Sequence, residues 1–173
     1  MLAERDVGTF RYQFPYMEFG KKRPDYHPVL HGTVRAAVRA AAVAAPGLPL
    51  VAGGKSMGGR MTSRVQSKDP QPGVTGLVFL GFPLHATNKP GTERGDHLRD
   101  VKVPMLFLQG TRDTLADLSL LAPLIHELGS NATMHVVEGG DHSFKVLKRS
   151  GRTEGDVFEG LANTIQSWTA NLP

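Results

Sequence analysis

Short apolar runs alternate along the chain with segments of helical periodicity. The runs cover residues 48–53, 74–82, 103–108 and 132–137, and each has the length of a strand. Residues 74–82 are apolar at almost every position, which is typical of a strand covered on both faces. Strands that alternate with helices predict a mostly parallel sheet with right-handed crossovers. The pattern therefore predicts an α/β fold, a three-layer sandwich.

Apolar residues spaced three or four apart predict helices between and after these strands. The first helix begins near Pro28 and ends at Pro46-Gly47; the second follows residue 56; the third lies within 115–128; the last covers 157–168. We expect Pro123 in the first turn of a second half of the third helix, and Gly129 as its C-cap.

One more strand is predicted at the front of the chain. Residues 7–14 are rich in aromatic and β-branched residues and stop at Pro15. Residues 83–99 are polar with Gly and Pro interruptions, which predicts a long excursion above the sheet. The chain has 173 residues, no internal repeat and no low-complexity segment, so we expect a single domain over 1–173.

Composition narrows the class of protein. Hydrophobic residues make up 40% and charged residues 21%, as in ordinary globular domains. The absence of cysteine excludes disulfides, thiolate metal sites and a cysteine nucleophile. The first six residues include three charged ones where a signal peptide needs an apolar core, and no run reaches membrane-spanning length. We therefore expect a cytoplasmic protein with no membrane partner.

The formal net charge is +4, and the basic residues are scattered, as in Lys21-Lys22-Arg23 and the segment 145–152. Nucleic-acid stacking platforms interleave aromatic residues with basic ones, and this chain does not. A solvated surface is favoured, and no nucleic-acid partner is expected. The basic clusters could still attract anionic substrates through their summed field.

The most informative motif is Gly54-Lys55-Ser56-Met57-Gly58. A G-x-S-x-G between a strand and a helix is typical of the nucleophile elbow of serine hydrolases. The tight turn strains the serine backbone and requires small neighbours, which Gly54, Gly58 and Gly59 provide. The serine hydroxyl then lies at a helix N-terminus, where free N–H groups favour negative charge.

Two later strand ends supply the partners that a serine nucleophile needs. Asp113 follows the strand ending at Leu108, and His142 follows the strand ending at Val137. Ligands of parallel sheets bind at the carboxyl ends of the strands, where both residues would lie. The order Ser56, Asp113, His142 is that of α/β-hydrolases. An imidazole oriented by a carboxylate can take the proton of the serine near neutral pH.

The chain resembles the α/β-hydrolase superfamily, in its dienelactone-hydrolase-like group. More closely, it is similar to a small family that contains the hydrolase-like domain of a chromatin-complex scaffold subunit and its short stand-alone relatives. The matching segments are 14–18, 53–61, 80–85, 109–113 and 140–144. The resemblance implies the α/β-hydrolase fold. It leaves the substrate open, and some relatives act as interaction scaffolds.

The front of the chain departs from this fold, so we expect an N-terminally shortened α/β-hydrolase fold. Several strands should precede the elbow strand, yet only residues 7–14 qualify. The backbone N–H of Met57 is one oxyanion donor, and a second has no visible source; one such donor is worth about 10²–10³ in turnover. The segment 7–14, or a second copy in a homodimer, would have to cover the elbow strand, or its edge stays open.

Each candidate also has a plainer interpretation. Ser56 could sit in an ordinary Gly-rich turn, and His142 could be a loop residue. Asp113 could cap the next helix, in which case Asp117 or Glu138 would be the acid. Asp141 is expected to form a turn. We assign substrate contacts to Lys55 and His85. Lys55 would contact an anionic substrate, and its plainer interpretation is a solvated lysine; that of His85 is a loop residue without chemistry. We expect structural roles for His126 and His135.

Two other site classes are excluded by spacing. A P-loop would need a glycine five positions before Gly54, where Pro49 stands. A zinc site built from His85, Asp96, His97 and Asp141 has no recognised ligand spacing. We expect no metal and no cofactor.

Two functions from different classes remain. One is a serine hydrolase, a carboxylesterase for small acyl esters that uses Ser56, His142, Asp113 and the Met57 N–H. The other is a weak or inactive hydrolase fold that serves as an interaction module. The complete triad favours the enzyme, and the absent oxyanion loop favours the module.

Overall fold

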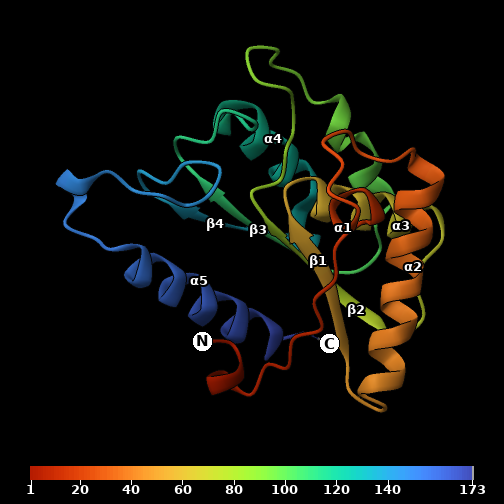
Figure 1. The fold of residues 1–173 in the computed structure, drawn as a ribbon. Helices are drawn as coiled ribbons and strands as arrows, with labels where there is room; N and C mark the ends of the chain where they lie inside the picture. Colours follow the sequence, from red (N-terminus) through yellow and green to blue (C-terminus); the bar gives the residue numbers. More distant parts are fainter. Residues whose placement is uncertain (173) are drawn as a thin grey trace.

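Four parallel strands form the centre of the computed structural model, which describes residues 1–172 (Figure 1). They are β1 (Leu50–Lys55), β2 (Val74–Leu80), β3 (Met105–Gly110) and β4 (Ala132–Val137). The sheet order is β1-β2-β3-β4, so strands that follow one another in the chain are neighbours. The predicted α/β class and the four strands after residue 47 are confirmed.

Helices cover both faces of the sheet. The α-helices are α1 (Pro15–Glu18), α2 (His27–Ala44), α3 (Met57–Lys68), α4 (Leu118–Leu128) and α5 (Glu154–Thr169); the 3₁₀ helices are η1 (Ala3–Arg5), η2 (Glu93–Asp100), η3 (Gly129–Asn131) and η4 (Lys148–Ser150). The crossover elements α3, η2 and α4 lie on one face together with α2, and α5 covers the other (Figure 1). This is the predicted three-layer sandwich.

Alternate residues of the central strands fill the two cores. Leu77 and Phe79 of β2 pack toward α4 and η2, whereas Val78 packs toward α5. The rings of Phe79 and Phe107 lie 4.7 Å apart, and both side chains are fully buried. A strand buried on both faces needs apolar residues at every position, which explains the nearly continuous apolar runs.

The third predicted helix was wrong in one detail. α4 is a single helix that begins at Leu118, with Asp117 as its N-cap, and Pro123 lies inside it instead of opening a second half. Pro123 is exposed to solvent, so water can bind the carbonyl that loses its amide partner.

The predicted strand over residues 7–14 was wrong, because this segment has no regular secondary structure. Its last aromatic residue packs against helices. Phe14 is buried among Leu30, Val34 and Met61, which belong to α2 and α3. A strand needs a hydrogen-bonded neighbour, and residues 8–13 donate no backbone hydrogen bond to β1.

Within residues 1–172, β1 therefore has a neighbour on one side only. We predicted that this edge would be covered by residues 7–14 or by a second copy, or would stay open. In the structure the edge is open, and Val51 is 36% exposed. No helix in the same residues combines the length and the apolar character that a membrane crossing requires.

Candidate active site

Ser56 occupies a strained turn between β1 and α3. Its backbone has φ 53° and ψ −122°, a region that residues with a Cβ rarely adopt. The turn is held from the sheet side, where the Ser56 N–H donates to Leu80 O at 3.0 Å. It is tight, because a Cβ on Gly59 would lie 2.7 Å from Gly54 O. These are the features predicted for a nucleophile elbow.

Asp113 is buried just beyond β3, and each of its carboxylate oxygens is hydrogen-bonded. Oδ1 accepts the backbone N–H of Leu115 at 2.8 Å, and Oδ2 accepts Nε2 of Gln109 at 2.5 Å. Oδ2 also lies 2.7 Å from Nδ1 of His142. A buried carboxylate held in this way can orient an imidazole and stabilise its charged form.

His142 lies in the loop after β4, with its ring packed against the backbone of Gly81. A Cβ on Gly81, which has φ 70°, would lie 3.2 Å from Nδ1 of His142. Since Nδ1 donates to Asp113, Nε2 carries the lone pair. Nε2 is buried and has no hydrogen-bond partner within residues 1–172.

The structure brings the predicted site residues together at the carboxyl ends of neighbouring strands. Ser56 follows β1, Asp113 follows β3 and His142 follows β4. The end of β2 connects them, because Leu80 binds the Ser56 N–H and the next residue, Gly81, contacts the His142 ring. The end of β2 therefore contacts both the strained turn of Ser56 and the ring of His142.

The other acidic candidates have structural partners. Asp117 accepts the N–H of Ser119 and caps α4. Asp141 Oδ1 accepts the N–H groups of Ser143 and Lys145 at 2.8 and 2.9 Å, which is the predicted turn. Glu138 is exposed, with a 3.5 Å contact to the hydroxyl of Thr111.

The two predicted substrate contacts differ in their surroundings. Lys55 is exposed at the end of β1, and its Nζ donates to Ser143 Oγ at 2.8 Å. His85 is buried; its Nδ1 lies 2.9 Å from Ala86 O, and its Nε2 accepts the N–H of Asp117 at 2.8 Å. Lys55 thus joins β1 to the loop that follows β4. His85 joins the loop that follows β2 to the N-cap of α4.

Sequence reasoning missed two contributors, Gln109 and Gly81. Gln109 is fully buried at the end of β3, and it binds both Asp113 and the N–H of Phe82. The available signal was an uncharged polar residue directly after an apolar run, four positions before the candidate acid. No comparable signal marks Gly81, since its role depends on a loop distant in sequence.

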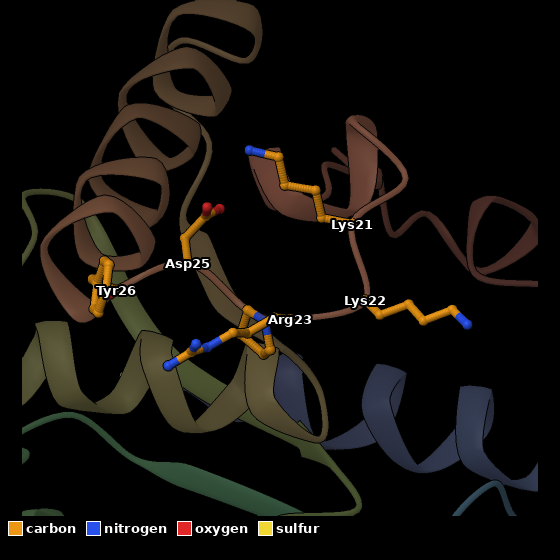
Figure 2. Close-up of a pocket in the computed structure, with 6 residues that line it drawn as sticks. Lys21, Lys22, Arg23, Asp25 and Tyr26 are labelled. Atoms are coloured by element: carbon orange, nitrogen blue, oxygen red, sulfur yellow. The ribbon is translucent and has the colours of Figure 1, made fainter.

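Two further features lie outside this arrangement. No three His, Asp or Glu side chains in residues 1–172 are placed to hold a metal ion. A shallow concavity of about 440 Å³ is lined by residues 21–26, and Figure 2 shows Lys22 pointing away from Asp25 there. None of the candidate catalytic residues lines it.

Several solved structures share this fold. An alpha-beta serine hydrolase homologue from Coxiella burnetii superposes with a TM-score of 0.62 at 16% identity, over 85% of this chain and 62% of that one. An esterase domain from Rhodothermus marinus superposes with a TM-score of 0.61 at 15% identity, over 82% of this chain and 69% of that one. A monoacylglycerol lipase from Paleococcus ferrophilus superposes with a TM-score of 0.61 at 15% identity, over 86% of this chain and 77% of that one.

The chain thus spans less than two thirds of the length of the Coxiella homologue. A family model described as an alpha/beta hydrolase domain matches residues 1–170, almost the whole sequence. The match includes Ser56, Asp113 and His142. This chain belongs to the α/β-hydrolase domain family.

Proposed function

We propose that this protein is a serine hydrolase, a carboxylesterase that acts on small acyl esters. The observation that carries the proposal is the environment of His142. Its Nδ1 binds the buried carboxylate of Asp113, and its buried Nε2 has no hydrogen-bond partner among the described residues. A nitrogen in this state is a general base that lacks only a proton donor.

In the proposed acylation step, Ser56 Oγ attacks the ester carbonyl carbon while His142 Nε2 takes the hydroxyl proton. Asp113 stabilises the imidazolium that forms. The tetrahedral intermediate then collapses as the C–O bond to the alcohol breaks, and His142 returns its proton to the leaving oxygen. The products are the alcohol and an acyl-serine ester.

In the proposed deacylation step, His142 Nε2 removes a proton from water as the water oxygen attacks the acyl carbon. The bond between this carbon and Ser56 Oγ then breaks, His142 returns the proton to Oγ, and the carboxylic acid is released. The negative oxygen of each intermediate would accept the backbone N–H of Met57. This N–H belongs to the first residue of α3, so it has no acceptor within its own helix.

Substrate contacts stay with Lys55 and His85 in this proposal. Lys55 would exchange its bond to Ser143 for a polar group of the substrate. His85 has both ring nitrogens occupied, so it would offer the substrate its ring rather than a hydrogen bond. The names of the Rhodothermus esterase domain and the Paleococcus lipase agree with ester chemistry on this fold.

Labelling with a fluorophosphonate tests the proposal, since the reagent phosphonylates only an activated serine. We expect one adduct per chain, located on Ser56 by mass spectrometry, and turnover of p-nitrophenyl acetate. The Ser56→Ala variant should lose both. The matched control is Ser67→Ala on the same helix, whose hydroxyl only bonds to Arg64 O. A folded protein without an adduct, or equal turnover by Ser56→Ala, would refute the proposal.

The second candidate is an inactive hydrolase fold that acts as an interaction module. The open edge of β1 favours it, because an unpaired strand edge can bind a strand from another chain. The resemblance to the chromatin-scaffold family points the same way. A folded protein that fails to label at Ser56 would make this the better proposal.

A further inference from the structure

Positive charge gathers along one face of α3 without acidic partners. Arg60, Arg64 and Lys68 are spaced four residues apart, so they are neighbours on this face. Within residues 1–172, none of the three lies within 4.0 Å of a carboxylate. Like charges at this spacing repel one another. The face therefore carries a charge that the described residues do not neutralise.

Histidines from two other elements flank the same face. His27 and His31 of α2 stack with their ring centroids 5.6 Å apart, and His97 of η2 has its Nε2 2.7 Å from Ser63 Oγ. Both α2 and η2 contact α3, and Figure 1 shows α2 alongside it. We refer to Arg60, Arg64, His31 and His97 as the basic cluster.

Three side-chain nitrogens of the basic cluster are removed from water and have no hydrogen-bond partner within residues 1–172. The Nε atoms of Arg60 and Arg64 and the Nε2 atom of His31 are buried without hydrogen-bond partners. Burial, together with the charges of Arg94 and Arg64, lowers the pKa of Arg60 to about 10. Unpaired buried donors destabilise a protein, so an unoccupied cluster of this kind costs stability.

Three other arginines of this chain are paired with carboxylates. Arg35 binds Asp69 at 2.9 Å, and Arg99 binds Glu127 at 2.7 Å. Arg5 binds Glu159. Three more arginines, at positions 94, 112 and 152, donate to backbone carbonyls. Arg60 and Arg64 differ from these three pairs, which points to an acceptor from outside the described residues.

We propose that the basic cluster binds a phosphate group, either as free phosphate or on a small phosphomonoester. The nitrogens without a partner belong to His31 of α2 and to Arg60 and Arg64 of α3, two helices that contact each other. A tetrahedral phosphate can accept from all of them, whereas a planar carboxylate presents two oxygens in one plane. Guanidinium groups match phosphate oxygens in geometry and in charge.

Calorimetric titration with inorganic phosphate and with phenyl phosphate, at constant ionic strength, tests the site. We expect saturable binding of at least one, and Arg64→Gln and Arg60→Gln should each weaken it about ten-fold or more. Arg149→Gln removes the same charge from η4, far from α3 in Figure 1, and should change affinity less than about two-fold. Ser56→Ala should bind phosphate like the wild type, which separates this site from the proposed esterase.

The two probes identify the source of the phosphate. Tighter binding of phenyl phosphate than of phosphate supports a phosphomonoester, and the reverse supports the free ion. Without ligand, Arg64→Gln should unfold at the same temperature as the wild type or a higher one, because it removes repulsion. Absence of saturable binding, or equal affinity in Arg64→Gln, overturns the proposal. Tight binding of a single-stranded RNA with no phosphate binding would also overturn it and assign the face to nucleic acid.

Discussion

The side-chain amide of Gln109 joins the carboxylate of Asp113 to the end of β2. Its Nε2 donates to Asp113 Oδ2 at 2.5 Å, and its Oε1 accepts the N–H of Phe82 at 3.0 Å. Gln109→Leu removes both bonds. We expect kcat for p-nitrophenyl acetate to fall by up to about 100-fold with little change in KM, because Asp113 is no longer held in place.

The matched control is Gln66→Leu, which removes another buried amide whose Oε1 accepts the N–H of Gln71. Both variants should lose about 1–3 kcal/mol of unfolding free energy in urea, since each leaves a buried group unpaired. Only Gln109→Leu should lower kcat. Equal kcat values for the two variants would remove Gln109 from the proposed site.

Replacing Asp113 by Asn tests which acid orients His142. The amide would present an N–H to Nδ1 of His142 and move the imidazole proton to Nε2, so the base would be lost. We expect kcat to fall by about 10³–10⁴ while the fold is kept. Asp117→Asn keeps a good N-cap for α4 and should retain full activity. The opposite result would make Asp117 the acid.

Strain at Ser56 should be measurable as stability. Its φ of 53° suits glycine better than a residue with a Cβ, and such strain costs about 1–3 kcal/mol. We expect Ser56→Gly to be inactive but about 1 kcal/mol more stable than the wild type in urea unfolding. Ser56→Ala keeps the Cβ and should gain nothing. A Ser56→Gly variant no more stable than Ser56→Ala would mean that the turn is unstrained.

His97 should make stability depend on pH. Burial, and then the charges of Arg64 and Arg60, lowers its pKa to about 4, with Lys68 acting in the same direction and Asp100 against it. An unfolded histidine titrates near 6.5, so between these values the unfolded state binds more protons. Stability is therefore fully present above pH 6.5 and is lost as pH falls toward 4, by roughly 2–3 kcal/mol.

Urea unfolding at pH 7.5 and pH 4.5 measures this contribution. The free energy of unfolding of the wild type should fall between pH 7.5 and pH 4.5. In His97→Gln this fall should be smaller by roughly 2–3 kcal/mol. His126→Gln replaces an exposed histidine of α4 and should behave like the wild type. A His97→Gln variant with an unchanged pH dependence would show that the buried imidazole does not resist protonation.

The open edge of β1 bears on the predicted homodimer. Val51 is 36% exposed on this strand, and a charge there should prevent pairing with another strand. We expect the wild type to scatter light as a dimer and Val51→Lys to be a monomer with unchanged secondary structure. A wild-type monomer at high concentration would exclude the homodimer.

The sequence could predict what depends on local pattern and on strand order. Apolar runs located the four strands, and their carboxyl ends placed Ser56, Asp113 and His142 at one edge of the sheet. Parallel topology does this without any knowledge of side-chain contacts, because every strand of such a sheet ends at the same edge.

The missed features depend on contacts between distant segments. Residues 7–14 have the composition of a strand, but a strand forms only beside a hydrogen-bonded neighbour. Phe14 packs against α2 and α3 instead. The basic cluster was missed because Arg60, His31 and His97 come together only when α2 and η2 pack against α3. Spacing within one segment cannot reveal such a group.

The lone neighbour of β1 also has a consequence for thermal behaviour. In the monomeric Val51→Lys variant, β1 is hydrogen-bonded on one side and frays more easily than the central strands, so its amides should exchange with deuterium earlier than those of β2 and β3. The proposed nucleophile stands at the end of this strand. Heating should then abolish turnover several degrees before the circular dichroism of the helices changes. The working temperature of this variant would be set by the fraying of one strand, and not by the melting of the whole domain.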